Sequence, residues 1–339
     1  MILIGLRYIA MLKDGDFMNQ DISGMRCLVT GAGGFLGSHL VASLISKGAV
    51  VTGFGRTPFG PHFEDGIKPK WILGSFDNEK EVTRACEGQD CIFHLLNSST
   101  PASATLNPAS DITSNVVPSI HLLEACKLAK VKKFIFASSG GTVYGAATQI
   151  PTTETAKAHP ISAYGVSKLT IENYLAFFGH IHELDYRILR ITNPYGPGQS
   201  PFKQQGVVAT FIHAALQNQP INIWGDGSAV RDYIYISDVI DAFTEILTHT
   251  GEDRIFNIGS GTGKSISEVW QDIKKMINPK SKIIYHASRK LDVPVSIVDT
   301  TLMQNKTTWR PKINWNNGLK MTRDWMIDQH SPISSIKVQ

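Results

Sequence analysis

The chain has 339 residues, of which 42% are hydrophobic and 18% are charged. Its length predicts one large domain with a smaller lobe, and its composition is ordinary for a soluble globular enzyme. The formal net charge of +4 comes from scattered lysines and arginines, which argues against a nucleic-acid-binding protein.

The first 24 residues are predicted to form a loose extension outside the fold. The apolar run over residues 1–10 is too short to span a bilayer, and no preceding basic segment or clear cleavage site marks a signal peptide. The four cysteines, at positions 27, 86, 91 and 126, lack the spacing of a disulfide framework or a zinc site. We therefore expect a cytoplasmic protein with no metal and no contact with a membrane.

Residues 25–37, Met-Arg-Cys-Leu-Val-Thr-Gly-Ala-Gly-Gly-Phe-Leu-Gly, predict a strand, a tight turn and the start of a helix. In such a turn the first glycine allows the chain to bend, the second lets a phosphate approach and the third lets helix pack on strand. The sequence therefore predicts a dinucleotide pyrophosphate site, and the alternative is an ordinary glycine-rich turn. The expected cofactor-binding positions are Gly31, Gly34, Phe35, Leu36 and Gly37.

The second predicted strand, over residues 49–56, ends where an NAD-binding fold normally offers a carboxylate to the adenine ribose. Gly55 and Arg56 occupy this place. A guanidinium suits a 2′-phosphate better than a diol, so Arg56 favours NADP. Alternatively, Arg56 stacks over the adenine or is solvated.

Further strands are predicted over residues 71–75, 91–96 and 133–139, with helices over 77–86 and 111–128. Alternating strands and helices at this spacing predict a doubly wound parallel α/β sheet over residues 25–191. Polar residues follow the strand over 91–96, at the carboxyl edge where such sheets bind ligands. His94 lies within an apolar run, and we interpret it as a hydrogen-bonded core histidine.

Tyr164 and Lys168 are four residues apart in a helix predicted to run to about residue 178, and so lie on one helical face. A phenol has an ordinary pKa near 10, and a neighbouring ammonium or nicotinamide charge lowers it toward the working range. The pair therefore suits removal of a proton from an alcohol whose hydride leaves for a nicotinamide.

A second lobe is predicted over residues 192–330, in which residues 238–259 return to the first domain and residues 331–339 form a tail. The lobe is expected to be smaller and of mixed α/β type. Its predicted helices cover residues 205–217, 238–248 and 265–277, and its predicted strands cover residues 221–224, 231–236, 254–259 and 282–285.

Several motifs occur along the chain in a fixed order. They are Thr30-Gly-x-x-Gly34-x-x-Gly37, Val143-Tyr-Gly, Tyr164-x-x-x-Lys168, Asn193-Pro-Tyr-Gly-Pro-Gly-Gln199, Gly225-Asp-Gly-Ser-x-x-Arg231-Asp-Tyr and Ser237-Asp-Val. Over about residues 25–328 the chain resembles the extended short-chain dehydrogenases/reductases of the nucleotide-sugar epimerase/dehydratase family. The resemblance implies a Rossmann domain with NAD, hydride chemistry at a sugar carbon and a C-terminal lobe for a UDP-linked sugar. It also implies a homodimer formed through a helix bundle.

The resemblance assigns roles to individual residues. Tyr164 would be the catalytic base, and Lys168 would hold the nicotinamide ribose and lower the tyrosine pKa. The other cofactor positions that it implies are Leu95, Leu96, Asn97, Asn115, which would support the neighbouring helix, and Thr192. The implied substrate positions are Asn193 at the diphosphate, Val207, Trp224 at the nucleobase, and Arg231 and Arg289 at phosphate.

Two of these positions have structural alternatives. Trp224 could instead pack in the core, as aromatic residues often do. Arg231 could instead form an ion pair with Asp232 or Asp238, since its planar fork suits carboxylate as well as phosphate.

The chain departs from the family at Gly140, where members usually carry a Ser or Thr whose hydroxyl bonds the sugar oxygen. Ser139, Thr142 or a water must then supply the hydroxyl, and we favour Thr142. Ser296 falls where the family places a residue that limits sugar bulk, and its small side chain would admit an N-acetyl group.

The sequence also lacks the acidic residues of two related activities. Gly141 and Thr142 replace the Asp-Glu pair of the 4,6-dehydratases, and the decarboxylases' Glu is missing too. We therefore predict a nucleotide-sugar 4-epimerase that acts on a UDP-hexose or UDP-N-acetylhexosamine by transient oxidation at C4. The alternatives are an NADPH-dependent 4-keto-sugar reductase, favoured by Arg56, and a catalytically inactive nucleotide-sugar-binding homologue, suggested by Gly140.

Overall fold

A computed structural model of the chain describes residues 22–57, 69–202, 206–289 and 292–330. The predicted tail over 331–339 and all but the end of the predicted extension over 1–24 lie outside these residues. Ile22, within that extension, is buried in the core, and the Gly24 N–H donates to the Gly48 carbonyl. The ordered packing therefore includes the residues just before the first strand.

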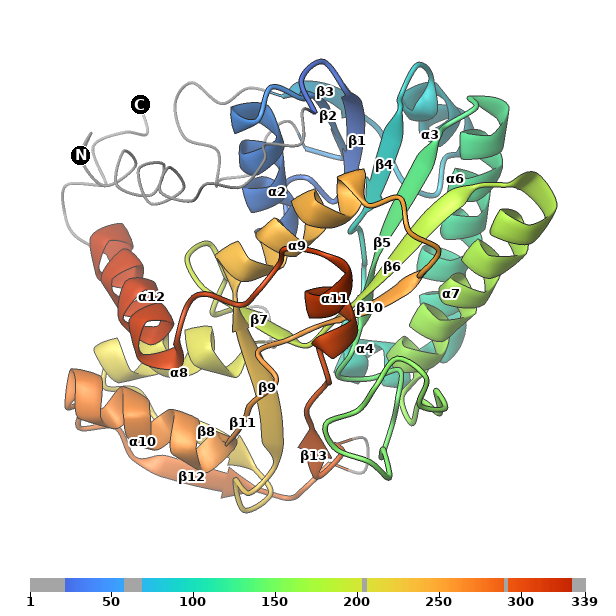
Figure 1. Ribbon diagram of the computed structural model, residues 1–339. Helices are drawn as coiled ribbons and strands as arrows, with labels where there is room; N and C mark the ends of the chain where they lie inside the picture. Colours follow the sequence, from blue (N-terminus) through green and yellow to red (C-terminus); the bar gives the residue numbers. More distant parts are fainter. Residues whose placement is uncertain (1–21, 58–68, 203–205, 290–291, 331–339) are drawn as a thin grey trace.

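A seven-stranded sheet forms the centre of the molecule (Figure 1). In spatial order its strands are β10 (Ile255–Ile258), β6 (Asp185–Ile191), β5 (Lys133–Ser139), β4 (Cys91–His94), β1 (Arg26–Thr30), β2 (Val50–Gly55) and β3 (Lys70–Leu73). All adjacent strands are parallel, and the order reverses between β1 and β4. The predicted doubly wound sheet is confirmed, and its reversal point is where such sheets bind ligands.

Helices cover both faces of this sheet because its strands bury apolar side chains on both sides. One face packs against α3 (Glu79–Cys86), α6 (Val117–Leu128) and α7 (Ala163–His182), and the other against α2 (Phe35–Ser46) and α9 (Ile236–Thr248). In β1, the Leu28 side chain packs on the face covered by α3, α6 and α7. Its neighbours Cys27 and Val29 pack on the face covered by α2 and α9. Alternation along the strand thus divides the core into two layers.

The helix predicted over residues 111–128 is regular only in its later part. Two short helices, α4 (Pro101–Leu106) and α5 (Pro108–Asp111), lead into a π-helical turn, η1 (Ile112–Val116), that continues as α6. Pro118 has no N–H to donate to the Ser114 carbonyl, which interrupts the regular ladder here.

The smaller lobe lies beyond the carboxyl ends of the central strands, with α8, α10, β8 and β12 at the lower left of Figure 1. Two small sheets build it, one from β7, β9, β11 and β13 and one from β8 and β12. The strands are β7 (Asn193–Tyr195), β8 (Ile221–Trp224), β9 (Val230–Tyr235), β11 (Gly263–Ser265), β12 (Ile283–His286) and β13 (Val295–Ser296). The helices are α8 (Val207–Leu216), α10 (Ile266–Ile277), α11 (Thr301–Lys306) and α12 (Trp315–His330). Between them, α9 and β10 return to the central sheet.

The strand β6 was not predicted from the sequence, because charged residues interrupt its apolar pattern. Arg187 and Arg190 lie within this central strand, and both are buried. Buried charges need partners, so the surroundings of these arginines decide whether the strand can form.

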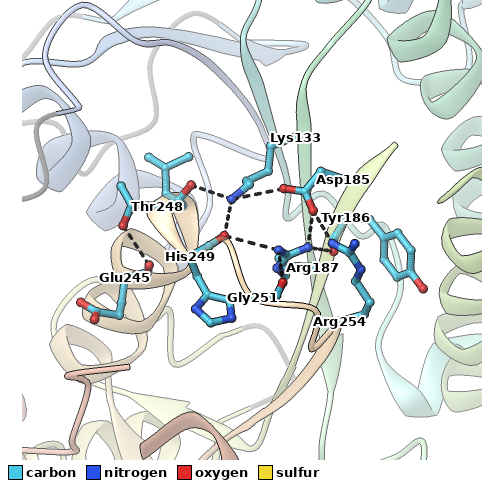
Figure 2. Close-up of polar contacts among 10 residues, drawn as sticks. Lys133, Asp185, Tyr186, Arg187, Glu245, Thr248, His249, Gly251 and Arg254 are labelled. Carbon is cyan, nitrogen blue, oxygen red and sulfur yellow. Dashed lines mark hydrogen bonds and ion pairs between the residues drawn. The ribbon is translucent and has the colours of Figure 1, made fainter. Parts of the chain in front are cut away.

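A cluster of charges around Asp185 binds the start of β5 and β6 to the chain after α9 (Figure 2). The Asp185 carboxylate pairs with Lys133, Arg187 and Arg254. Lys133 also donates to the carbonyls of Leu247 and His249, at 3.0 and 2.7 Å. Burial lowers the pKa values of Lys133 and Arg187, and the Asp185 carboxylate opposes both shifts. One carboxylate therefore compensates three cations.

We expect Asp185→Asn to lower the free energy of unfolding by about 2–4 kcal/mol, because Lys133 and Arg187 stay buried without their counter-charge. Urea unfolding followed by circular dichroism measures the change. Asp241→Asn is the matched control, since its exposed pair with Lys312 should contribute less than about 1 kcal/mol. Equal losses in the two variants would contradict the role of Asp185.

Candidate active site

The loops after β1 and β4 approach each other so closely that only glycine fits between them. Gly31 has a φ of 74°, and a Cβ on it would lie 2.9 Å from the Leu96 nitrogen. A Cβ on Gly37 would lie 2.1 Å from the Gly31 carbonyl oxygen. The glycine spacing is therefore a steric requirement of the turn between β1 and α2.

The start of α2 suits an anion. Its N-cap, Gly34, provides no side-chain hydrogen bond, and no acidic residue lies in the first turn. The N–H groups at Phe35 and Leu36 therefore remain for a pyrophosphate, which the helix dipole also favours. At the end of β6, the Thr192 hydroxyl is buried and has no hydrogen-bond partner among the described residues. The N–H groups at the start of α2 fit a dinucleotide along the carboxyl ends of the strands.

Arg56 lies directly after β2 and is exposed. It contributes to a lowered pKa of Asp77, whose main cause is a hydrogen bond from Ser75. The guanidinium is therefore at the predicted end of the strand, with a carboxylate nearby.

The loop after β4 is held by Asn115, a buried residue of η1. The Asn115 side-chain oxygen accepts from the Ser98 N–H at 2.8 Å, and its amide donates to the Ser99 hydroxyl at 3.2 Å. Asn97 in turn donates to the Ser99 carbonyl at 2.7 Å. His94, at the end of β4, is buried between the Thr30 and Ser119 hydroxyls, so its interpretation as a core histidine is confirmed.

Tyr164 and Lys168 lie in the first turns of α7, which begins where the Ser162 hydroxyl accepts from the Gly165 N–H at 3.2 Å. The Lys168 Nζ donates to the Ala137 carbonyl of β5 at 2.9 Å. It lies 5.7 Å from the centre of the Tyr164 ring. Because α7 is bound to β5 in this way, both side chains reach the carboxyl end of the sheet.

The predicted lowering of the tyrosine pKa is not found in the polypeptide by itself. Burial, assisted by the Asp111 carboxylate, raises the pKa of Tyr164 to about 12. Burial lowers the pKa of Lys168 to about 8, against the opposing effect of Asp111 and Glu172. The cost of removing the phenolate from water therefore decides the direction of the Tyr164 shift.

Gly140 and the two candidate hydroxyls, those of Ser139 and Thr142, differ in the space around them. A Cβ on Gly140 would lie 2.8 Å from the Arg190 carbonyl oxygen and 3.2 Å from Val298. The Thr142 hydroxyl is buried and unpartnered among the described residues. Ser139, the last residue of β5, is half-buried. Thr142 is also half-buried as a residue, but its hydroxyl oxygen belongs to the buried part, so the Ser139 hydroxyl is the more open of the two.

The predicted nucleobase residue Trp224 ends β8 and is 45% exposed, which excludes the alternative of core packing. It stacks on His286 of the paired strand, with ring centres 5.0 Å apart. The Arg289 guanidinium lies 4.0 Å from the Trp224 ring centre. The structure thus brings Trp224 and Arg289 together.

Arg231 forms an ion pair, but its partner is Asp292 and not Asp232 or Asp238, so the partners named for the structural alternative are wrong. It donates to the Val293 carbonyl at 2.8 Å and lies 3.6 Å from the Asp292 carboxylate. Asp232 instead accepts from the Ser260 N–H and hydroxyl. Arg231 is therefore joined to residues 292–293, just before β13.

The remaining predicted substrate positions, Asn193 and Val207, lie on β7 and α8. Asn193 donates to the Asp232 carbonyl at 3.0 Å, and Val207 is the first, half-buried residue of α8. Ser296 of β13 lies beside Arg231 of β9 and 4.0 Å from a Cβ built on Gly141. The smaller lobe thus reaches the segment that follows β5.

Three buried charged residues around this site were not predicted from the sequence, namely Asp111, Glu172 and Arg190. Asp111 lies four residues before Asn115, and Glu172 lies four residues after Lys168. The helical spacing was a usable signal, because residues four apart share a face. Arg190 gave no such signal, since β6 itself was not identified.

Within the described ranges, no three His, Cys, Asp or Glu side chains gather as a metal site would require. All four cysteines are buried and unpaired. No helix in the described part of the chain has the length and apolarity needed to cross a bilayer.

Comparison with known proteins finds similarity to sugar-nucleotide enzymes. Residues 27–259 match the family model described as the NAD dependent epimerase/dehydratase family. UDP-glucose 4-epimerase of Mycolicibacterium smegmatis is 34% identical over 304 residues, which cover 88% of this chain and 97% of that protein. dTDP-4-dehydro-6-deoxyglucose reductase of Escherichia coli is 30% identical over 300 residues, covering 86% and 94%.

Solved structures give the same result. UDP-glucose 4-epimerase of Thermotoga maritima, solved with UDP-glucose, has a TM-score of 0.85 and 36% identity, covering 91% of this chain and all of its own. The UDP-glucose 4-epimerase of Thermus thermophilus, solved with NAD, has a TM-score of 0.82 and 30% identity, covering 89% and 99%. A UDP-N-acetylglucosamine 4-epimerase of Methanobrevibacter ruminantium has a TM-score of 0.83 and 27% identity, covering 91% and 99%.

Proposed function

Because the chain belongs to the NAD-dependent epimerase/dehydratase family, we propose that it is a nucleotide-sugar 4-epimerase that acts on a UDP-linked hexose or N-acetylhexosamine. The predicted family, fold and oxidoreductase-type chemistry are confirmed by the comparisons. Two of the compared UDP-glucose 4-epimerase structures support the choice of reaction and of nucleotide.

One observation carries the proposal: the Tyr164–Lys168 pair lies at the end of β5, next to a segment without a carboxyl group. Residues 140–142 are Gly-Gly-Thr, so no acid and base for the elimination of water lie there. Proton removal and return at one hydroxyl need only the phenol and its neighbours.

NAD, when bound at the glycine turn, would supply the hydride acceptor and donor for the sugar carbon. Tyr164 removes the proton of the C4 hydroxyl and gives it back after the sugar has turned. Lys168 keeps a positive charge beside the phenol and stabilises the phenolate. Because the Tyr164 pKa is raised to about 12 in the polypeptide, the phenolate also depends on the positive nicotinamide.

We assign the hydroxyl that binds the sugar oxygen to Ser139 and no longer favour Thr142. A buried hydroxyl cannot contact a sugar unless its neighbours move, and that of Thr142 is fully buried. A Ser or Thr in place of Gly140 would not fit without a shift of the backbone, since its Cβ would lie 2.8 Å from the Arg190 carbonyl oxygen.

We assign the UDP moiety to the smaller lobe. Trp224 is stacked on His286, so a base would take the side of the ring that the Arg289 guanidinium now covers. Arg231 and Arg289 would then offer their guanidinium groups to the diphosphate. The small side chain of Ser296, near Gly141, leaves room for an N-acetyl group on the sugar.

The second candidate, an NADPH-dependent reductase of 4-keto sugars, is supported by Arg56 and by the reductase relative. Incubation of the purified holoprotein with UDP-sugars, without added cofactor, separates the two reactions. An epimerase interconverts the C4 epimers with the NAD it retains. Absence of interconversion, together with NADPH oxidation by a 4-keto sugar, would overturn the first proposal. An inactive binding homologue would bind UDP-sugar and do neither.

We also propose that the protein is a homodimer, joined through one face of α7 and the start of α6. Exposed apolar side chains lie there at helical spacing, namely Ile112, Val117, Val166, Tyr174, Phe177 and Ile181. Exposed apolar side chains grouped on neighbouring helices are typical of a subunit interface.

Phe177→Asp is expected to convert the dimer into monomers, because a carboxylate would be buried in an apolar interface. Size-exclusion chromatography with light scattering measures the mass. Tyr285→Asp, on the exposed β12, is the control and should leave the mass unchanged. A dimer that persists in the Phe177 variant would place the interface elsewhere.

A further inference from the structure

Asp111, the last residue of α5, is a buried carboxylate next to the catalytic pair. Only 3% of the residue is exposed. It accepts hydrogen bonds from the Ser99 hydroxyl, from the Asn115 amide at 2.9 Å and from the Ser167 hydroxyl at 2.5 Å. These donors come from the loop after β4, from η1 and from α7. One carboxylate thus joins the three segments that surround the site.

Ser167 connects this carboxylate directly to the catalytic turn. It precedes Lys168 and lies three residues after Tyr164 on α7. Any displacement of Ser167 therefore moves the backbone that carries both side chains. The Asn115 end of the network also holds the loop at Ser98, so the same carboxylate sets the distance between that loop and α7.

Asp111 forms no ion pair with another described residue, unlike the other buried carboxylate near Lys168. Glu172, one turn further along α7, pairs with Arg190 at 2.6 Å and also accepts from the Ser138 hydroxyl. The charge of Glu172 is therefore compensated within the network of β6. The donors to Asp111 are neutral, so its charge remains to act on Lys168.

We propose that Asp111 is a positioning residue for the catalytic pair: it fixes the Tyr164–Lys168 turn through Ser167 and provides the negative charge that keeps the Lys168 side chain an ammonium. The inference rests on the proposed function, in which Tyr164 and Lys168 perform the proton transfer. This role explains why a carboxylate, which is costly to bury, lies beside Tyr164 although its charge disfavours the phenolate form of that residue.

The charge of Asp111 acts on both members of the pair in the same direction. It raises the pKa of Tyr164, in addition to the larger effect of burial, and it raises that of Lys168 against burial. The other ionisable groups that face Lys168 are Glu172, which is paired with Arg190, and His94. Burial lowers the pKa of His94 to about 3, so this residue is neutral.

Asp111→Asn tests the charge while it keeps the shape and most hydrogen bonds of the side chain. Without the carboxylate both pKa values fall, so both limbs of the pH profile of kcat should move to lower pH in the NAD-containing protein. The tyrosinate absorbance that is lost in Tyr164→Phe reports the titration of Tyr164 without turnover. Its midpoint should also fall in Asp111→Asn.

Ser167→Ala tests the position separately, because it removes the connection to α7 and leaves the charge. We expect about a tenfold lower kcat with pH limbs that do not move. If Asp111→Asn does not fold, Ser167→Ala still tests the proposal. A kcat for Ser167→Ala equal to that of the unmodified protein would overturn the positioning role of Asp111.

A lower kcat in Asp111→Asn without a shift of either pH limb or of the Tyr164 titration would show that Asp111 is only structural. If the unmodified protein epimerises no UDP-sugar, the proposed function fails, and the Tyr164 titration still decides whether Asp111 acts on the pair. The two failures are therefore distinguishable.

Discussion

Tyr164→Phe is expected to lower the rate of epimerisation by about 10³-fold or more, because the variant has no group that can take the C4 hydroxyl proton. The change deletes one oxygen atom and leaves the aromatic ring next to Lys168. Coupled assay of the product sugar measures kcat, and bound NAD and the affinity for UDP are measured in parallel. Both should stay unchanged, since the phosphate and base contacts lie elsewhere.

The matched control is Tyr174→Phe, which removes a phenol oxygen from the exposed side of the same helix. It should retain full activity. A Tyr164 variant with substantial activity would show that another group is the base. A Tyr164 variant that loses NAD would indicate a failure of folding or binding, and the affinity measurements separate this from a loss of chemistry.

Ser139→Ala is expected to lower kcat by about 10²-fold, because its hydroxyl would bind the oxygen on which charge develops. Thr142→Val, which exchanges the buried and unpartnered hydroxyl for a methyl group, should change kcat by less than about threefold. The same coupled assay compares the two variants.

Other results for these two variants would contradict the assignment of the hydroxyl to Ser139. A large loss in Thr142→Val together with an active Ser139→Ala would return the role to Thr142. Equal and small losses in both variants would assign the sugar contact to a water. Thermal unfolding of the two variants checks that neither change acts through stability, since both side chains lie near the end of β5.

The glycine turn and the first five strands were predictable because their signals are local. Glycine spacing, apolar runs and helical periodicity depend on near neighbours in the chain, and they placed Gly31, Gly37 and His94 correctly. The strand β6 was not predictable in this way. Its buried Arg187 and Arg190 are tolerated only because Asp185, main-chain carbonyls and Glu172 meet them in space.

In the catalytic site, too, some features follow from local sequence and others depend on the tertiary structure. The sequence by itself determined the Tyr164–Lys168 pair, because four-residue spacing on a helix puts both on one face, and it determined the absence of a carboxyl group in residues 140–142. Only the tertiary structure decided that Ser139 is more open than Thr142, that burial raises the Tyr164 pKa, and that Asp111 joins three segments around the pair. Exposure and desolvation depend on atoms brought together from distant parts of the chain, and no local pattern encodes them.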